Sequence, residues 1–196
     1  MLTLPILDLT VVSTYTCTLS RSGAFEGSFD FEVWRPTKPP KGYILADYCQ
    51  PQNWNLPPPG TPPTEQSVVV LDVINDDPVN PVLKAPENYV ALWTCQVGNQ
   101  IRGVFMPVAP IGYVACGAVG LSFTDKIPDK ITVDGFMCVR VDYTETVDRN
   151  TGLSMLTSQN YDCGPLTTWQ VNRMRTFTAA QLRSPAPLVS VPRNAP

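Results

Sequence analysis

Two stretches of this sequence match each other: residues 33–48 read VWRPTKPPKGYILADY, and residues 104–119 read VFMPVAPIGYVACGAV. Each copy predicts a strand that ends in an aromatic residue, a proline-rich turn, a Gly-Tyr pair and a second apolar strand. Proline stops the first strand because it fixes φ and has no N–H to donate to a ladder. The glycine then allows the bend at which pairing starts again. The two copies indicate an internal pseudo-repeat, over 29–52 and 100–123, within one domain.

The rest of the chain also favours β structure. β-branched and aromatic residues alternate with polar ones, and Gly98-Asn99 is a two-residue hairpin signal. No stretch has the period of an amphipathic helix of normal length. We therefore predict an all-β fold, an antiparallel sandwich or prism of short strands with proline-rich loops. Strands are expected over 10–19, 67–74, 89–97, 100–106, 136–147, 153–161 and 166–171, with a hairpin turn at 149–152 and one helical turn at 178–183.

The composition fits a single β-rich domain over residues 1–183, followed by a proline-rich C-terminal tail over 184–196. Hydrophobic residues make up 43% of the 196 residues, which is enough for a sizeable core. Charged residues make up only 16%, against a usual level of about 25%, and 21 residues are proline. Such an uncharged surface is common where partners cover a protein. We expect the tail to be held by its own domain or by a neighbour.

The charge pattern argues against two kinds of environment. The net charge is −3, and the basic residues cluster only as two pairs, so we do not expect nucleic acid as a partner. Residues 103–124 carry no charge and are long enough to span a bilayer. They contain two prolines, however, and they overlap the copy of a stretch that is charged. We therefore predict no transmembrane segment.

The cysteines are widely scattered, unlike the dense pattern of a small disulfide-stapled secreted domain. The N-terminus has no basic leader and carries Asp8 within its apolar run, which is unlike a signal peptide. We expect free, buried thiols and a cytoplasmic or other intracellular location, including membership of an assembled particle. The six cysteines are Cys17, Cys49, Cys95, Cys116, Cys138 and Cys163.

The side chains needed for common catalytic mechanisms are missing. The chain has no histidine, which excludes Ser-His-Asp and Cys-His catalysis and histidine-ligated zinc. It also lacks a Cys-x-x-Cys pair, a Walker loop and a dinucleotide-binding glycine motif. Carboxylates gather near Asp76 and near Asp142, where a calcium site or a glycosidase pair is one interpretation. Turn chemistry such as Asn75-Asp76-Asp77-Pro78 explains them better. We predict a protein that is not an enzyme and has no cofactor or metal.

Several motifs resemble a known family. They are Trp34-Arg35-Pro36 with Pro40-Lys41-Gly42-Tyr43, Val104-Phe105-Met106-Pro107 with Gly112-Tyr113, Cys138-Val139-Arg140-Val141-Asp142, and Trp169-Gln170-Val171-Asn172. Over about residues 29–178 the pattern resembles the domain of the vacuolar protein sorting-associated protein 62 family. It is also similar to a single repeat of the adaptor-binding domain of the vacuolar protein sorting 13 lipid-transfer proteins. In those repeats, grooves between strands take proline-containing peptides and a late asparagine is structurally important. The resemblance places that asparagine at Asn172.

Candidate binding residues come from this resemblance, from the first proline turn and from the tryptophans. Trp93 and Trp169 lie inside apolar strands and are predicted to be core residues, whereas Trp54 lies in the proline-rich loop 53–63. We predict a protein–protein interaction module. The alternatives are a structural subunit (coat, sheath or capsid-associated protein) that assembles through its tail and proline-rich loops, or a toxin-like module that recognises a glycan or a membrane surface. The candidate residues are Trp54, Asn172, Arg35, Trp34, Lys38 and Lys41.

Overall fold

The computed structural model describes residues 4–21, 25, 30–51, 58–180 and 186–196. These residues are almost entirely in strands and their connections, which confirms the predicted all-β fold class. The elements are β1 (Ile6–Val12), β2 (Tyr15–Leu19), β3 (Phe31–Pro36), β4 (Tyr48–Pro51), β5 (Ser67–Ile74), β6 (Leu83–Lys84), β7 (Asn88–Val97), β8 (Gln100–Val108), β9 (Tyr113–Val114), β10 (Val119–Thr124), β11 (Cys138–Arg140), the 3-10 helix η2 (Val141–Tyr143), β12 (Thr144–Val147), β13 (Leu153–Tyr161), β14 (Gly164–Val171), β15 (Thr176–Ala180) and β16 (Val189–Pro192).

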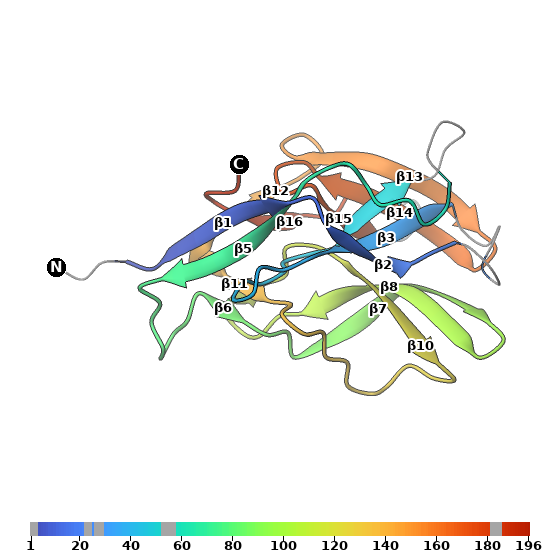
Figure 1. Ribbon diagram of the computed structural model, residues 1–196, viewed down its shortest axis with the longest axis horizontal. Coiled ribbons are helices and arrows are strands. Elements are labelled where there is room, and N and C mark those ends of the chain that lie inside the picture. Colours follow the sequence, from blue (N-terminus) through green and yellow to red (C-terminus); the bar gives the residue numbers. More distant parts are fainter. Residues whose placement is uncertain (1–3, 22–24, 26–29, 52–57, 181–185) are drawn as a thin grey trace.

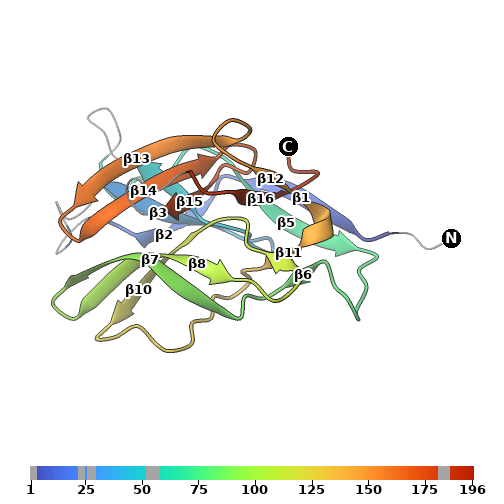
Figure 2. The same cartoon turned by 180° about the vertical axis from the view of Figure 1, so that it is seen from behind.

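One strand arrangement occurs three times along the chain. Two consecutive strands pair, and a later strand joins the second of them, which gives the sheets β2-β3-β4, β7-β8-β10 and β13-β14-β15. The strand before each sheet pairs with a strand after it: β1 with β5, β6 with β11 and β12 with β16. Figure 1 shows β13 and β14 above, β7, β8 and β10 below, and β2 and β3 between them. The view from behind shows the same order (Figure 2).

The three larger sheets meet at a closed ring of backbone hydrogen bonds. The Asp47 N–H donates to the Ala118 carbonyl over 3.0 Å, the Ala118 N–H donates to the Phe177 carbonyl over 2.8 Å, and the Phe177 N–H donates to the Asp47 carbonyl over 2.9 Å. All three residues are fully buried. A Cβ atom on Gly117 would lie 2.5 Å from the Phe177 carbonyl oxygen, so only glycine fits beside the ring. Asp47 and Ala118 directly precede β4 and β10, and Phe177 lies in β15, so the ring joins the three sheets at a single interior point.

A buried ion pair supports this ring. Arg35 Nε and Nη2 donate to the two carboxylate oxygens of Asp47 over 3.0 and 3.1 Å, and the Gly120 N–H donates to the same carboxylate over 2.9 Å. Arg35 also donates to the Gly120 carbonyl over 3.1 Å. Burial raises the pKa of Asp47 above its ordinary value, while Arg35 and the Gly120 N–H act in the opposite direction. The pair ties β3 and β10 to the ring.

The structure corrects four expected elements. The expected strand over 136–147 is divided into β11, the 3-10 helix η2 and β12. Residues 10–19 are divided between β1 and β2, because β1 pairs with β5 whereas β2 pairs with β3. The expected hairpin across 149–152 does not form, because β12 pairs with β16 and β13 pairs with β14. Thr178 is in a strand rather than a helical turn, since it pairs with Trp169 across β14 and β15. Residues 181–183 of that expected turn lie outside the described residues.

The described part of the C-terminal tail belongs to the fold. β16 pairs with β12, and Val189, Val191 and Ala195 are buried in one core cluster together with residues of β1, β5 and β14. Arg173 Nε donates to the Ala195 carbonyl over 3.2 Å, which fixes the segment beyond β16. These residues of the tail are therefore held by their own domain. The uncharged stretch 103–124 supplies most of β8 and all of β9 and β10. Among the described residues no helix is long and apolar enough to cross a membrane.

Candidate functional site

Of the predicted binding residues, Trp34 is buried and Arg35 is partly buried. Trp34 is only 3% exposed, and the guanidinium of Arg35 is engaged by Asp47. Both side chains therefore serve the centre of the fold in the isolated chain. Trp54 lies outside the described residues. Trp93 and Trp169 are buried, as expected of core residues.

The first proline turn places its two lysines differently. The Lys38 side chain lies over Gly135, and its Nζ stands 3.9 Å from the Asp134 carboxylate. Lys41 is exposed and lines a groove of about 370 Å³. The other residues that line this groove are Asp8, Pro39, Pro40, Leu71, Asp72 and Ile74.

Asn172 is exposed at the turn between β14 and β15, and it lines a groove of about 520 Å³. The turn closes through the Arg175 N–H, which donates to the Val171 carbonyl over 2.8 Å. Arg175 has a φ of 51°, in the left-handed region that non-glycine residues rarely adopt. The other residues that line the groove are Val11, Thr64, Glu65, Gln66, Val68, Arg173 and Pro196.

This groove has charged walls and an apolar floor. The side chains of Arg175 and Glu65 are each about half exposed, and their charged atoms stand 3.8 Å apart. Val11 is 45% exposed and supplies apolar surface next to the charges, whereas Val68, which also lines the groove, is buried. In the sequence, Arg175 stands out only as a member, with Arg173, of one of the two basic pairs, and Glu65 does not stand out at all. Nothing along the chain shows that Arg175 and Glu65 meet.

A second groove of about 410 Å³ lies near the other end of β1. Its residues come from the start of the chain, from the region around η2 and from the C-terminus, so no single motif reveals it. Arg193 and Asn194 line this groove and Pro196 lines the first, so the C-terminal segment contributes to both. The residues are Leu4, Pro5, Ile6, Leu7, Arg140, Asp142, Tyr143, Arg193 and Asn194.

The clustered carboxylates are used within the fold. Asp76 accepts the N–H of Val82 over 2.9 Å, and Asp77 accepts the N–H of Val79 over 2.9 Å. Asp142 forms an ion pair with Arg140 over 2.7 Å. These contacts are those of turn residues and surface ion pairs. Among the described residues, no group of three or more cysteine or acidic side chains is placed to hold a metal ion.

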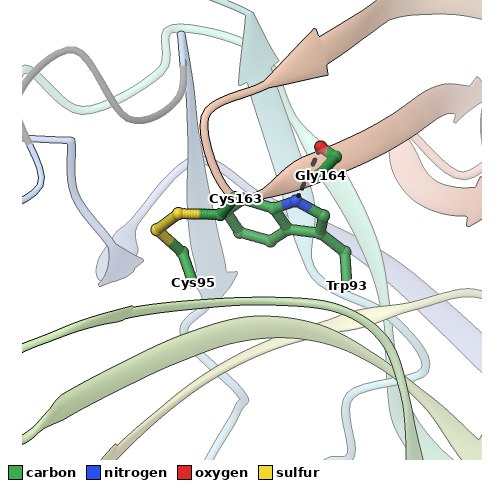
Figure 3. The surroundings of a disulfide bond; sticks show 4 residues. All are labelled: Trp93, Cys95, Cys163 and Gly164. Atoms are coloured by element: carbon green, nitrogen blue, oxygen red, sulfur yellow. Dashed lines mark hydrogen bonds between the residues drawn. A yellow bond between two sulfur atoms is a disulfide. The ribbon is translucent and has the colours of Figure 1, made fainter.

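A disulfide joins the second and third large sheets. Cys95 of β7 bonds to Cys163 in the turn between β13 and β14, across 68 residues of sequence and with the Cα atoms 5.0 Å apart. Figure 3 shows Trp93 beside this bond, with its indole N–H donating to the Gly164 carbonyl over 3.2 Å. The expectation of free thiols is wrong for this pair. The spacing of cysteines along the chain does not reveal it, because the two partners belong to different sheets.

The other four cysteines are free, and three of them are buried. Burial raises the pKa of Cys49 and of Cys138 to about 12, and it raises the pKa of half-buried Cys17 to about 11. These thiols are therefore protonated at neutral pH. Since the thiolate is the reactive form, they are poor nucleophiles and poor metal ligands.

Replacing both Cys95 and Cys163 by alanine is expected to lower the free energy of unfolding by about 2–4 kcal/mol, because the cross-link closes a long loop in the unfolded chain. Urea unfolding followed by tryptophan fluorescence measures this loss, and reductant should cause a similar loss in the unchanged protein. The control Cys17→Ala leaves the cross-link intact and should cost less. An unfolding midpoint that neither reductant nor the double substitution shifts would show that the cross-link does not support the fold.

These observations define an all-β module in which three larger sheets meet at a buried ring of backbone hydrogen bonds, with smaller strand pairings beside them and open grooves on the surface. The chain belongs to the family described as Vacuolar protein sorting-associated protein 62 (Vps62), whose pattern matches residues 1–182. Among solved structures it is similar to that of GNIP1Aa from Chromobacterium piscinae, with a TM-score of 0.67 and 15% identity. The match covers 92% of this chain but only 34% of that one, and at this identity it shows a shared fold. No curated protein matches the sequence.

Proposed function

We propose that this protein is a non-enzymatic protein–protein interaction module that takes an extended, proline-containing peptide in the groove at Asn172. The observation that carries the proposal is the position of Asn172, exposed on the wall of a groove of about 520 Å³. The resemblance to the adaptor-binding repeats matches this residue to their late asparagine. Membership of the Vps62 family and the open form of the groove are consistent with recognition of a partner.

The chemistry of the groove suits such a peptide. A polyproline-like segment has no internal hydrogen bonds, so its carbonyl groups are free to accept from a side-chain amide such as that of Asn172. Its proline rings would pack on the exposed apolar surface of Val11. The charged side chains of Glu65 and Arg175 at the rim would select neighbouring residues of the peptide. Because a polyproline-like segment is already extended, little conformational entropy is lost on binding.

The walls of the groove are held together before any ligand arrives. The Ser67 hydroxyl donates to the Arg175 carbonyl over 2.7 Å, and the Val68 N–H donates to the Met174 carbonyl over 2.9 Å. These bonds fasten β5 to the turn between β14 and β15, which form two sides of the groove. A preformed groove supports binding, because the protein then loses little conformational freedom when the peptide enters.

The test begins with a phage-displayed library of proline-containing twelve-residue peptides, selected on the purified protein. Fluorescence anisotropy with a selected peptide should show that Asn172→Ala weakens binding about tenfold or more, since a tenfold change corresponds to about one lost hydrogen bond. The control Asn99→Ala changes the same residue type at the exposed β7–β8 turn and should bind like the unchanged protein. A library that yields no binder, or binders that Asn172→Ala retains with full affinity, would contradict the proposal.

A further inference from the structure

The outer face of the β1–β5 pair carries exposed apolar side chains. Ile6 and Ile74 are partners across this pair and are 54% and 45% exposed, and Leu71 is 42% exposed. Leu4, just before β1, is also exposed. Single exposed apolar residues are ordinary, but a contiguous group marks an interaction site. We call this surface, with the Asp8 and Asp72 carboxylates that lie within it, the ribbon face.

Two carboxylates oppose each other within the ribbon face. Asp8 and Asp72 are direct partners in the antiparallel register, so their side chains lie on the same face with Cβ atoms about 5 Å apart. Like charges in this position destabilise a sheet. Both residues line the groove that contains Lys41. Within the described parts of the chain, however, neither carboxylate has a lysine or arginine at ion-pair distance.

We propose that the ribbon face docks a segment of a partner protein in which a lysine or arginine is flanked by apolar residues. The cation enters between Asp8 and Asp72 and relieves their repulsion, while its apolar neighbours cover Ile6, Leu71 and Ile74. We choose this occupant because its positive charge complements the carboxylates of Asp8 and Asp72. An anionic membrane surface would be repelled by the two carboxylates, and a second copy of the chain would bring four carboxylates together.

This surface is separate from the groove of the proposed function. The residues that line the Asn172 groove are all different from those that line the groove beside Asp8 and Asp72. A substitution that abolishes binding at one site should therefore leave binding at the other unchanged. Substitutions at Asn172 and at the two carboxylates distinguish the two proposals.

The repulsion predicts an unusual gain in stability. Asp8→Asn and Asp72→Asn should each raise the thermal midpoint of the free protein by about 1–3 °C, because each removes one of two opposed charges. The control is Asp142→Asn, which removes a carboxylate that is paired with Arg140 and should not raise the midpoint. If the first two substitutions lower the midpoint, the carboxylates are not in repulsion and the proposal fails.

Binding is tested with a phage-displayed library of random twelve-residue peptides, selected in parallel on the unchanged protein and on the Asp8→Asn/Asp72→Asn double variant. Only the unchanged protein should enrich peptides with a basic residue between apolar ones. A peptide chosen in this way should bind the double variant at least about tenfold more weakly, bind Asn172→Ala normally, and weaken as salt is added. Lys41→Ala should bind it at least as tightly, since a competing cation is removed.

Four results would overturn the proposal. The same peptides could be enriched on both proteins, or no basic residue could be enriched on either. The selected peptides could lose affinity for Asn172→Ala instead of for the double variant, which would place them in the other groove. Sedimentation could show the unchanged protein dimerising while Ile74→Asp stays monomeric, which would assign the ribbon face to a second copy of the chain.

Discussion

Removal of residues 189–196 is expected to leave the chain largely unfolded, or to lower its free energy of unfolding by about 5 kcal/mol or more. The deletion takes away β16, which pairs with β12 along its whole length, and it exposes the core that Val189, Val191 and Ala195 cover. Burial of one valine contributes about 1.5 kcal/mol or more, and whole domains are stable by only about 5–15 kcal/mol.

Circular dichroism and urea unfolding of the truncated chain measure this loss. Two point substitutions give a graded comparison: Val191→Ala should cost about 2 kcal/mol, whereas Leu188→Ala, at a side chain that is 74% exposed, should change stability by less than about 0.5 kcal/mol. A truncated chain with the unfolding midpoint of the full chain would show that β16 does not belong to the fold.

Asp47→Ala is expected to cost about 3–5 kcal/mol. The substitution leaves the Arg35 guanidinium partly buried without its carboxylate partner, and it removes the acceptor of the Gly120 N–H. Loss of one member of a buried ion pair is costly because the remaining charge has no compensation. Asp47 is also a member of the backbone ring. Loss of its side-chain contacts should therefore weaken the hydrogen bonds by which the ring joins the three sheets.

A double-mutant cycle of Asp47→Ala and Arg35→Ala measures the coupling free energy between these two side chains. The matched control is the pair Arg140 and Asp142, which is also joined by two hydrogen bonds but has its carboxylate 59% exposed. Its coupling should be below about 1 kcal/mol, as for other surface pairs. If Asp47→Ala costs no more than Asp142→Ala, the buried pair does not support the ring.

Local chemistry was enough to predict the fold class and several strands. The apolar run Ser67–Ile74 has the bounds of β5, and Gly98-Asn99 does form the turn between β7 and β8. The errors lie where the pairing partner is distant in the sequence. The segment before residue 149 looks like half of a local hairpin, but β16 at the far end of the chain is its partner. The disulfide escaped prediction for the same reason.

The candidate site was predicted only in part. Asn172 came from a resemblance, and its groove also needs Val11, Glu65 and Pro196, which meet only in the folded chain. Arg35 was expected at an interface, whereas in the isolated chain it pairs with Asp47 of the same quoted stretch. An arginine and an aspartate within one apolar, proline-broken stretch are a signal for such an internal pair. The opposed carboxylates of the ribbon face depend on the β1–β5 register, which the sequence does not specify.

Mapping of backbone amide chemical shifts during titration with a selected proline-containing peptide tests the binding site most directly. We expect the shifts to change at Gln66, Asn172 and Arg175, around the groove, while the ring amides of Ala118 and Phe177 stay as they are. Changes confined to surfaces away from this groove, or no changes at a concentration that saturates anisotropy, would contradict the assignment of the groove as the recognition site.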